Sequence, residues 1–576
     1  MEELINVARG LAEADLVLKN GYVVNVFTRT AERADVAISG SRIAGVGTDY
    51  KGKREIDCSG FYVMPGFIDT HVHIESSMLS PVEFCKAILR WGTTTFIADP
   101  HEIANVCGEA GVLYMIDECA KVPVNAHMML PSCVPATRFE SAGAEIDAKT
   151  AERMIKDPEI FGLGEFMNAR GVIENKSECA EKLAAASRAG KIADGHCPCL
   201  AGKDLAAYIA AGIKTDHECA ERASMIERVK MGMYVQMREG SAAKNIAELI
   251  KGVNDANLRR ITFCTDDMHA DALTRGHISL NLAKAVECGL DPLSAVVIAT
   301  LNAAECYGLR DRGAIAPGYA ADIAVCRDLK DFTAEYVLVR GELVAQAGKT
   351  FCGAVPSADI RVMNTVRHDG VKPEDFEIKS GSKFVNAIKI TDQSLVTGRI
   401  VRKVKIRKDG SVNTDGSGLL KLAVVERHKR TGNIGRALLE NCGLKGGAIA
   451  QTIAHDSHNI IVLGDNDGDM ACAVNELIRI GGGIAVASRS RILDSLPLEI
   501  GGLMTALPLE QFHERFIKLC ECARALDVGP GAEPFMTLSF LALPVIPHVK
   551  LTDKGLFDVT KFEFLPIEAE ESEYEE

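Results

Sequence analysis

Six residues of the types that bind divalent metals follow successive apolar runs in the first half of the chain. They are His71, His73, Glu165, His196, His217 and Asp266. In a barrel of parallel strands, the side chains at the carboxyl ends of the strands meet at one mouth. Imidazole and carboxylate groups gathered there suit Zn²⁺, Mn²⁺ or Fe²⁺. The spacing therefore predicts a dinuclear metal hydrolase in which all six residues are metal ligands.

His71 and His73 close the run FYVMPGFIDTHVH. Side chains alternate with a period of two along a strand, so both imidazoles point to the same face. Two neutral imidazoles placed in this way can chelate one divalent ion. The polar sequence IESS that follows is typical of a barrel mouth, and we expect the first metal here.

Glu165 ends the glycine-flanked apolar run FGLGE. A buried carboxylate is costly unless a cation meets it. We predict that Glu165 bridges the first metal to a second metal, which His196 and His217 complete. The alternative is a salt bridge from Glu165 to Arg170 or Arg138.

An aspartate precedes each histidine of the second metal, Asp194 before His196 and Asp216 before His217. Such carboxylates can orient the imidazoles by hydrogen bonding. The run HCPC that begins at His196 also suggests a zinc site with cysteine ligands. Its spacing is Cys-x-Cys rather than Cys-x-x-Cys, so we expect the thiols not to bind metal.

Asp266 closes the last of these runs and is followed by Asp267 and His269. A carboxylate at a strand end can touch the first metal and accept the proton of a metal-bound water. Asp267 competes for this role, but the position at the strand end favours Asp266. We expect Asp267 and His269 to contact the substrate.

The segment Asp99-Pro100-His101-Glu102 follows the second apolar run. One interpretation is a helix start, with Asp99 as the cap and Pro100 in the first helical position. This interpretation leaves the next two side chains without a role. We predict that His101 contacts the substrate and that Glu102 is a catalytic residue.

Strand-like and helical patterns alternate in the chain, which indicates βα units and a parallel sheet. Eight predicted strands end near residues 70, 98, 129, 164, 194, 215, 236 and 265. They predict an α/β fold with a (β/α)8 TIM-like barrel over residues 66–305. Residues 1–65 and 306–350 share a texture of short strands and predict one small β-sandwich domain built from both flanks. Residues 351–565 predict a C-terminal α+β domain, and residues 566–576 an acidic, disordered tail.

Composition excludes several classes of function. The 576 residues carry a formal net charge of −14 and one Trp, which disfavours nucleic-acid or membrane-surface binding. Without an apolar stretch of about 18 residues or an apolar signal core, we expect no membrane span and a cytoplasmic protein. The 18 scattered cysteines indicate reduced, buried thiols. The basic run at 399–410 predicts an edge strand with outward Lys and Arg.

The C-terminal part contains a second concentration of histidines. His428, His455 and His458 lie in polar loops, the last two in the sequence AHDSHN together with Asp456. A third metal site or a wall of the substrate pocket is one interpretation. A hydrogen-bonded loop in a packed domain is the other, and the sequence leaves both open.

These motifs resemble the amidohydrolase superfamily: PGFIDTHVH after the first strand, single histidines after the fifth and sixth, and an aspartate after the eighth. The sequence GAIAPGYAADIA resembles the returning β domain of that superfamily. Many dinuclear members bridge their metals with a carboxylated lysine after strand four, whereas this chain has Glu165. That departure, with ADPHEIANV at 98–106 and CTDD at 264–267, is similar to bacterial and archaeal adenine deaminases. The sequences ERHKRTGNIG at 426–435 and AHDSHN at 454–459 extend the resemblance over most of the chain.

The resemblance implies hydrolytic deamination of adenine to hypoxanthine and ammonia in purine salvage, with two Mn²⁺ or Fe²⁺ ions per active site. A metal-bound hydroxide is expected to attack C6, with Asp266 as proton acceptor, while Glu165 or Glu102 protonates N1. The resemblance also implies a homo-oligomer, a dimer or larger. Two alternatives stay open: an amidohydrolase acting on another cyclic amide or aminated purine, and a non-catalytic metal-binding scaffold. The physiological metal is not fixed by the ligand types.

Overall fold

The computed structural model describes residues 1–241, 243–391, 395–440, 442–528 and 534–574. The chain forms two compact units. The first comprises Met1–Pro100, Met115–Ser132 and Asp147–Ser357, and the second comprises His101–Tyr114, Cys133–Ile146 and Ala358–Glu576. Two segments that the sequence assigned to the barrel domain therefore belong to the second unit. The division at residues 65, 305, 350 and 565 stays a prediction.

A nine-stranded mixed sheet in the first unit combines strands from both flanks of the predicted barrel. Eight of its strands run in the order β18-β17-β16-β15-β5-β1-β2-β3, and β4 pairs with β1. The strands are β1 (Ala14–Asn25), β2 (Thr30–Ser39), β3 (Arg42–Gly47), β4 (Gly52–Asp57), β5 (Tyr62–Pro65), β15 (Ile323–Cys326), β16 (Ala334–Val339), β17 (Glu342–Gln346) and β18 (Lys349–Thr350). The two flanks meet where β15 runs antiparallel to β5, with Ile323 opposite Pro65. Helix α1 (Glu2–Ala8) precedes the sheet.

All eight predicted strands of the central region are present, and each ends within a few residues of its predicted end. They are β6 (Phe67–His73), β7 (Thr93–Ala98), β8 (Asn125–Leu130), β9 (Ile160–Phe166), β10 (Ala193–Gly195), β11 (Thr215–Asp216), β12 (Tyr234–Arg238) and β13 (Ile261–Cys264). They form a parallel sheet in the order β10-β9-β8-β7-β6-β14 and a second parallel sheet in the order β11-β12-β13. The short strand β14 (Asp266–Asp267) follows β13 and pairs with β6, so the chain passes from one sheet to the edge of the other.

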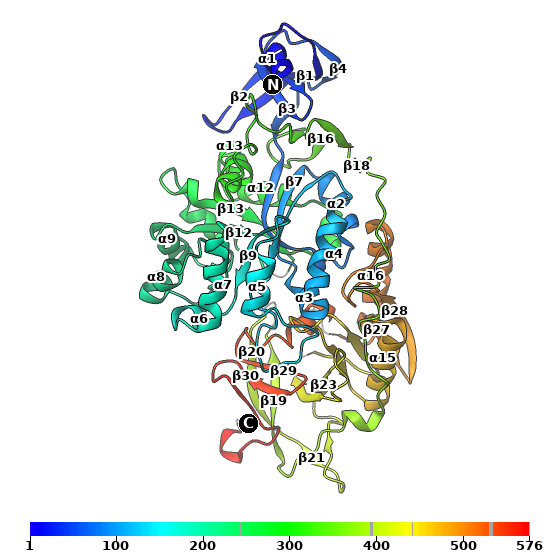
Figure 1. Cartoon of the computed structure of the whole chain (residues 1–576). Helices are drawn as coiled ribbons and strands as arrows, with labels where there is room; N and C mark the ends of the chain where they lie inside the picture. The colour runs from blue at the N-terminus through cyan, green and yellow to red at the C-terminus, as the bar shows by residue number, and fades with distance from the viewer. Residues whose placement is uncertain (242, 392–394, 441, 529–533, 575–576) are drawn as a thin grey trace. The chain divides into compact units, whose positions relative to one another are not determined.

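Helices connect these strands, and several flank them in Figure 1. They are α2 (Pro81–Leu89), α3 (His101–Cys107), α4 (Glu109–Cys119), α5 (Ala148–Met154), α6 (Ala169–Ile173), α7 (Ser177–Arg188), α8 (Gly202–Ala210), α9 (Arg222–Lys230), α10 (Ile246–Leu249), α11 (Ala270–Leu273), α12 (Ile278–Glu287), α13 (Pro292–Val297) and α14 (Ala303–Cys306). Local sequence sets several starts. The side chain of Ser80 accepts a hydrogen bond from the amide of Glu83, and Pro81 is the first residue of α2. In the same way Asp291 accepts the amide N–H of Ser294, and Pro292 is the first residue of α13. The strands themselves are almost wholly buried, as expected for a parallel sheet covered by helices.

The second unit is built on an eight-stranded sheet in the order β20-β19-β24-β23-β26-β25-β27-β28. Its strands are β19 (Phe384–Ile390), β20 (Thr397–Lys403), β23 (Leu419–Val425), β24 (Ile434–Glu440), β25 (Ala448–Gln451), β26 (Ile460–Gly464), β27 (Gly483–Ser488) and β28 (Arg491–Pro497). The first part of the basic run, residues 399–403, lies in β20, which is an edge strand as predicted. Helix α15 (Asp467–Ile480) packs its apolar face, including Met470 and Leu477, into the core of this sheet.

Smaller elements complete the second unit. They are the pair β21 (Lys405–Ile406) and β22 (Val412–Asn413), the sheet β29 (Val549–Thr552), β30 (Gly555–Asp558) and β31 (Glu563–Phe564), and the helices α16 (Leu509–Arg524) and α17 (Pro534–Phe540). The first residues of the predicted disordered tail are paired: the amide of Asn386 donates to the carbonyl of Ile567, and the amide of Ala569 to that of Phe384.

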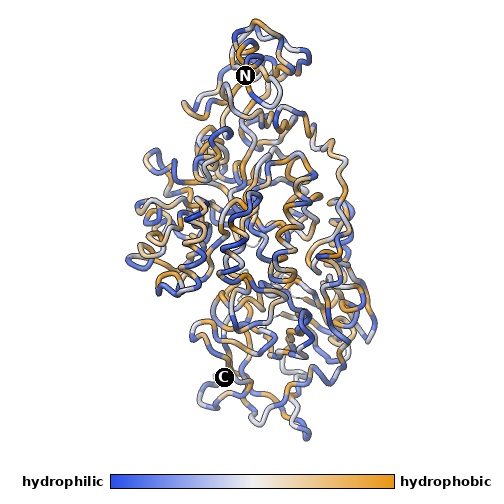
Figure 2. The backbone as a smooth tube through the Cα atoms, viewed as in Figure 1, coloured by the Kyte–Doolittle hydropathy of each residue, from blue (hydrophilic) through white to orange (hydrophobic). Residues whose placement is uncertain are grey.

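Hydrophobic and hydrophilic stretches are interleaved along the backbone in Figure 2. In the part of the chain that the structure describes, no helix is both long and apolar enough to cross a membrane. All 18 cysteines are free thiols, and most are buried, in agreement with the sequence.

Candidate metal centre

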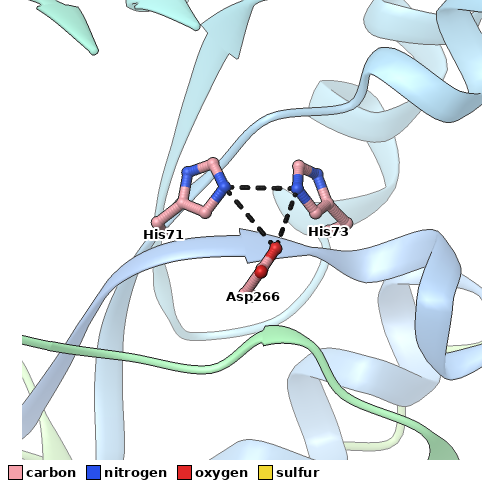
Figure 3. A group of neighbouring side chains, drawn as sticks. All are labelled: His71, His73 and Asp266. Carbon is pink, nitrogen blue, oxygen red and sulfur yellow. Dashed lines mark hydrogen bonds and ion pairs between the residues drawn. The ribbon is translucent and has the colours of Figure 1, made fainter. Parts of the chain in front are cut away.

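His71, His73 and Asp266 converge where strands β6 and β14 pair (Figure 3). The two Nε2 atoms lie 3.2 Å apart. Oδ1 of Asp266 lies 3.2 Å from Nε2 of His73 and 3.8 Å from Nε2 of His71. Asp266 has a φ of 56°, a left-handed conformation that is costly for a residue with a Cβ and that is typically retained at functional sites. The period-two spacing of the histidines thus brings both rings to one point.

Glu165, at the end of β9, joins this group to the other two histidines. Its Oε1 lies 3.3 Å from Nε2 of His73 and 4.0 Å from Nε2 of His71. Its Oε2 lies 2.7 Å from Nδ1 of His196 and 3.2 Å from Nε2 of His217. One carboxylate oxygen therefore faces each pair of imidazoles. The alternative partner Arg170 instead pairs with Glu174.

Asp99 supports both sides of this arrangement from the end of β7. Its carbonyl accepts the Nδ1–H of His73 at 2.8 Å, so the neutral form of that ring, the form that binds metals, turns the lone pair of Nε2 toward the carboxylates. Its Oδ2 accepts the amide of Glu165 at 2.8 Å. A Cβ on Gly164 would lie 2.1 Å from Oδ2 of Asp99, so the glycine before Glu165 makes room for that carboxylate.

Asp69 ties β6 to the segment after β13. Its Oδ1 accepts the amides of His71, at 3.2 Å, and Thr265, at 3.1 Å. Its Oδ2 lies 3.2 Å from Nε2 of His277. The residues that precede Asp266 are thereby held against the strand that carries the two histidines.

The geometry and charge of the cluster fit divalent metal ions. Ligand atoms bound to one ion at about 2.1 Å are roughly 3.0–3.5 Å apart, as several of these pairs are. Burial and the neighbouring rings of His217 and His73 lower the pKa of His71 well below its usual value, so the ring is neutral, the form that metals bind. Burial opposes protonation of His196, but Glu218 and Glu165 raise its pKa to about 9. The cluster therefore attracts positive charge.

The aspartates that precede His196 and His217 do not act as the sequence analysis expected. Asp194 accepts the hydroxyls of Thr215 and Tyr307, and burial raises its pKa to about 7. Asp216 accepts the amide of Cys197 and pairs with Arg228 at 2.5 Å. Both aspartates therefore stabilise the ends of the strands through hydrogen bonds and an ion pair, and they do not orient the imidazoles.

Two charged residues at the cluster were missed in the sequence. Glu218 lies 3.6 Å from Nε2 of His217 and 4.0 Å from Nδ1 of His196. Arg238, at the end of β12, pairs with Glu218 and with Asp266. Burial opposes ionisation of Asp266, but Arg238, His73 and His217 together hold its pKa well below its usual value. The only sequence signal was the position of each residue at the end of a strand.

Two further predicted site residues, Asp267 and His269, lie in different surroundings. Asp267 accepts the hydroxyl of Ser76, and the amide of His269 donates to Oγ of Ser241. Neither residue is among the groups of possible metal ligands found in the described ranges, and no such group contains a cysteine. His101 and Glu102 begin α3 and belong to the second unit.

Within the second unit, Glu102 is part of another buried cluster. Glu102, His455 and His458 each place one possible ligand atom within 4.8 Å of the others. Oε1 of Glu102 lies 3.2 Å from Nδ1 of His455, whose ring stacks on Phe540. Burial opposes ionisation of Glu102, but His455, His458 and His101 together lower its pKa, so Glu102 is an anion at neutral pH.

The hydrogen bonds of the histidines distinguish this cluster from the first one. Nδ1 of His458 accepts the amide of Ala454 at 3.3 Å, so a neutral ring carries its proton on Nε2. His428 donates from Nε2 to the carbonyl of Ser457 at 2.7 Å. Both contacts favour the interpretation of a hydrogen-bonded loop over that of a third metal site.

Comparisons with known proteins match two family models and several relatives of nearly the same length. The model of the amidohydrolase family matches residues 62–344, and that of the adenine deaminase C-terminal domain matches residues 394–563. An adenine deaminase of Clostridium acetobutylicum is 49% identical over 568 residues, covering 98% of this chain and 100% of the relative. An adenine deaminase of Nitratidesulfovibrio vulgaris (strain DP4) is 48% identical, with 98% and 99% covered. An adenine deaminase 2 of Carboxydothermus hydrogenoformans is 45% identical, again with 98% and 99% covered.

Proposed function

This chain belongs to the adenine deaminase family, and we propose that it hydrolyses adenine to hypoxanthine and ammonia. The observation that carries the proposal is Glu165, whose two oxygens face two separate pairs of imidazoles. It supplies a bridging carboxylate from an unmodified side chain.

We propose that the cluster holds two divalent ions, Mn²⁺ or Fe²⁺. His71, His73 and Asp266 would hold one, His196 and His217 the other, and Glu165 both. When bound, such ions supply activation of a water molecule and stabilisation of negative charge. We further propose that the two parallel sheets close into one (β/α)8 barrel, because β14 returns the chain to the edge strand β6.

Asp266 is the proposed acceptor of the proton that the attacking water loses as its oxygen bonds to C6 of the purine. The carboxylate is buried and is kept ionised by its surroundings, so it is in the form that can accept a proton. Asp69 and the pairing with β6 fix the backbone on either side of Asp266. The Asp266 side chain is therefore already positioned, and little conformational entropy is lost when it takes part in the reaction.

The ring nitrogen N1 must gain a proton as the purine loses aromaticity, and the amino group must gain one before it leaves as ammonia. Glu165 is the proposed carrier of a proton to N1, since its carboxylate lies in the metal cluster itself. It would take one proton of the attacking water and pass it to N1, while Asp266 passes the other proton to the leaving amino group. Glu102 is the second candidate, but its lowered pKa means that it must first be given a proton. We propose His101, Asp267 and His269 as substrate contacts.

We propose on the family resemblance alone that the enzyme serves purine salvage in the cytoplasm as a homo-oligomer, a dimer or larger. The mass of the purified protein by light scattering tests the assembly.

The central test is the ultraviolet spectrum of adenine during incubation with Mn²⁺-loaded protein, combined with metal analysis of the same preparation. We expect conversion to hypoxanthine, release of ammonia, and about two transition ions per chain. Loaded protein that leaves adenine unchanged but opens a cyclic amide, or deaminates another purine, would reject the substrate. Protein that binds no transition ion would reject the dinuclear site.

A further inference from the structure

Arg238 connects two carboxylates at the edge of the metal cluster. Its Nη1 lies 2.5 Å from Oε1 of Glu218 and also donates to Oδ2 of Asp266. The residue is only 9% exposed. A buried guanidinium shared between two carboxylates is held far more firmly than a surface ion pair.

Because of this contact, the two oxygens of Asp266 have different partners. Oδ1 is directed to Nε2 of His73, at 3.2 Å, and to Nε2 of His71, at 3.8 Å. Oδ2 is directed to the guanidinium of Arg238. Without Arg238 nothing in these contacts would distinguish the two oxygens, and the carboxylate would be able to turn about its Cβ–Cγ bond.

Glu218 lies close enough to His196 and His217 to bind a metal with them if it were released from Arg238. Its Oε1 lies 3.6 Å from Nε2 of His217 and 4.0 Å from Nδ1 of His196, and the three residues form one of the possible metal-ligand groups. Arg238 occupies that same oxygen at 2.5 Å. The guanidinium thus competes with a metal ion for Glu218.

The backbone of Arg238 is fixed on the side where Glu218 lies. The amide of Arg238 donates to Oδ1 of Asn245 at 2.7 Å, and the amide of Asn245 returns to the carbonyl of Arg238 at 2.9 Å. Nδ2 of Asn245 donates to the carbonyl of Cys219, the residue after Glu218, at 2.8 Å. Asn245 therefore joins the two chain segments that carry the ion pair.

We propose that Arg238 is a positioning residue that directs Oδ1 of Asp266 to the metal and keeps Glu218 away from His196 and His217. The inference deepens the proposed function and rests on it. The cluster then presents one bridging and one terminal carboxylate, while Glu218 stays outside the coordination sphere. A lysine would keep the charge but lacks the planar set of donors that reaches two carboxylates at once.

The test compares R238Q, R238K, E218Q and the double variant R238Q/E218Q in the full-length, Mn²⁺-loaded protein. The measurements are kcat and KM for adenine, the number of Mn²⁺ ions per chain, and the rate at which a chelator removes Mn²⁺. R260Q is the matched control, because Arg260 lies over the ring of Tyr234 at the other end of β12. We expect R260Q to match the wild type in every measurement.

For R238Q we expect kcat to fall at least tenfold with KM changed less than threefold. Chelator removal of Mn²⁺ should slow severalfold, because Glu218 becomes a ligand. The double variant should regain the wild-type removal rate but not kcat, and R238K should recover only part of kcat. Wild-type kcat and removal rate in R238Q would overturn the proposal. So would a slow removal rate that persists in R238Q/E218Q, or a loss of kcat explained entirely by a lower melting temperature.

Failure of this proposal is distinguishable from failure of the proposed function. If the wild type does not deaminate adenine, the function fails, while the chelator measurement still tests whether Arg238 restrains Glu218. If the wild type deaminates adenine and R238Q behaves like it, only the role of Arg238 fails.

Discussion

The two units each bury a group of histidines and carboxylates, but the two groups are built for different chemistry. In the first unit, Nδ1 of His73 donates to a backbone carbonyl, so in the neutral ring the lone pair of Nε2 faces the carboxylates. In the second unit, Nδ1 of His458 accepts a backbone amide, so Nε2 is an N–H. Both groups combine histidines with a glutamate. The partner of the other ring nitrogen decides which group can bind a metal.

The carboxylates differ in the same sense. Burial opposes ionisation of Asp266 in the first unit, but Arg238, His73 and His217 together hold its pKa well below its usual value, and the group stays ionised. Burial, reinforced by Asp456, raises the pKa of Glu140 in the second unit to about 8, and the group retains a proton. The first cluster therefore contains an ionised carboxylate that attracts cations, whereas Glu140 beside the second cluster is a neutral carboxylic acid.

The largest expected effect is the loss of the first cluster. In H73A, we expect at least one metal ion per chain to be lost and adenine turnover to fall by about a thousandfold or more, equivalent to about 4 kcal/mol. Metal analysis and the adenine assay on one preparation measure both. Full metal content and turnover in H73A would contradict the assignment of His73 as a ligand.

E102Q tests whether the second cluster takes part in catalysis at all. If Glu102 is a catalytic residue, turnover should fall at least tenfold while metal content stays intact, since the amide keeps the shape but not the charge. The control is E174Q, which removes the exposed partner of Arg170. Turnover of E102Q close to that of the wild type would exclude Glu102 from the reaction.

H458A tests whether His458 stabilises the second unit through hydrogen bonding and does not bind a metal. The ring is fully buried and bonded to the amide of Ala454, so we expect a loss of about 1–3 kcal/mol in the free energy of unfolding. Metal content should remain at the wild-type value. Denaturant unfolding and metal analysis check the two statements, and loss of one ion per chain would instead establish a third metal site.

Part of this comparison was accessible from the sequence. The period of two along a strand predicted that His71 and His73 share a face, and the glycines around Glu165 marked a carboxylate in a crowded place. The role of Arg238 was not accessible, because it depends on β12 extending two residues past its predicted end at residue 236. Likewise, the sequence position of Glu102 after β7 suggested the barrel mouth, whereas its contact with His455 depends on a chain segment some 350 residues away.

The last expected effect is a pH dependence of stability that arises from Glu140. Its pKa is about 8 in the folded protein and about 4.3 in an unfolded chain. The folded state therefore binds the proton more tightly, so this contribution to stability is complete below about pH 4 and is lost as the pH rises to about 8. The slope is at most about 1.4 kcal/mol per pH unit.

Because glutamine retains the shape of the neutral acid, E140Q should be more stable relative to the wild type at pH 8 than at pH 5. Denaturant unfolding at both pH values measures the difference, with E174Q again as the control. Parallel curves for E140Q and the wild type would mean that Glu140 is ionised in the folded protein, and the contrast between the carboxylates of the two units would then reduce to the arrangement of the histidines.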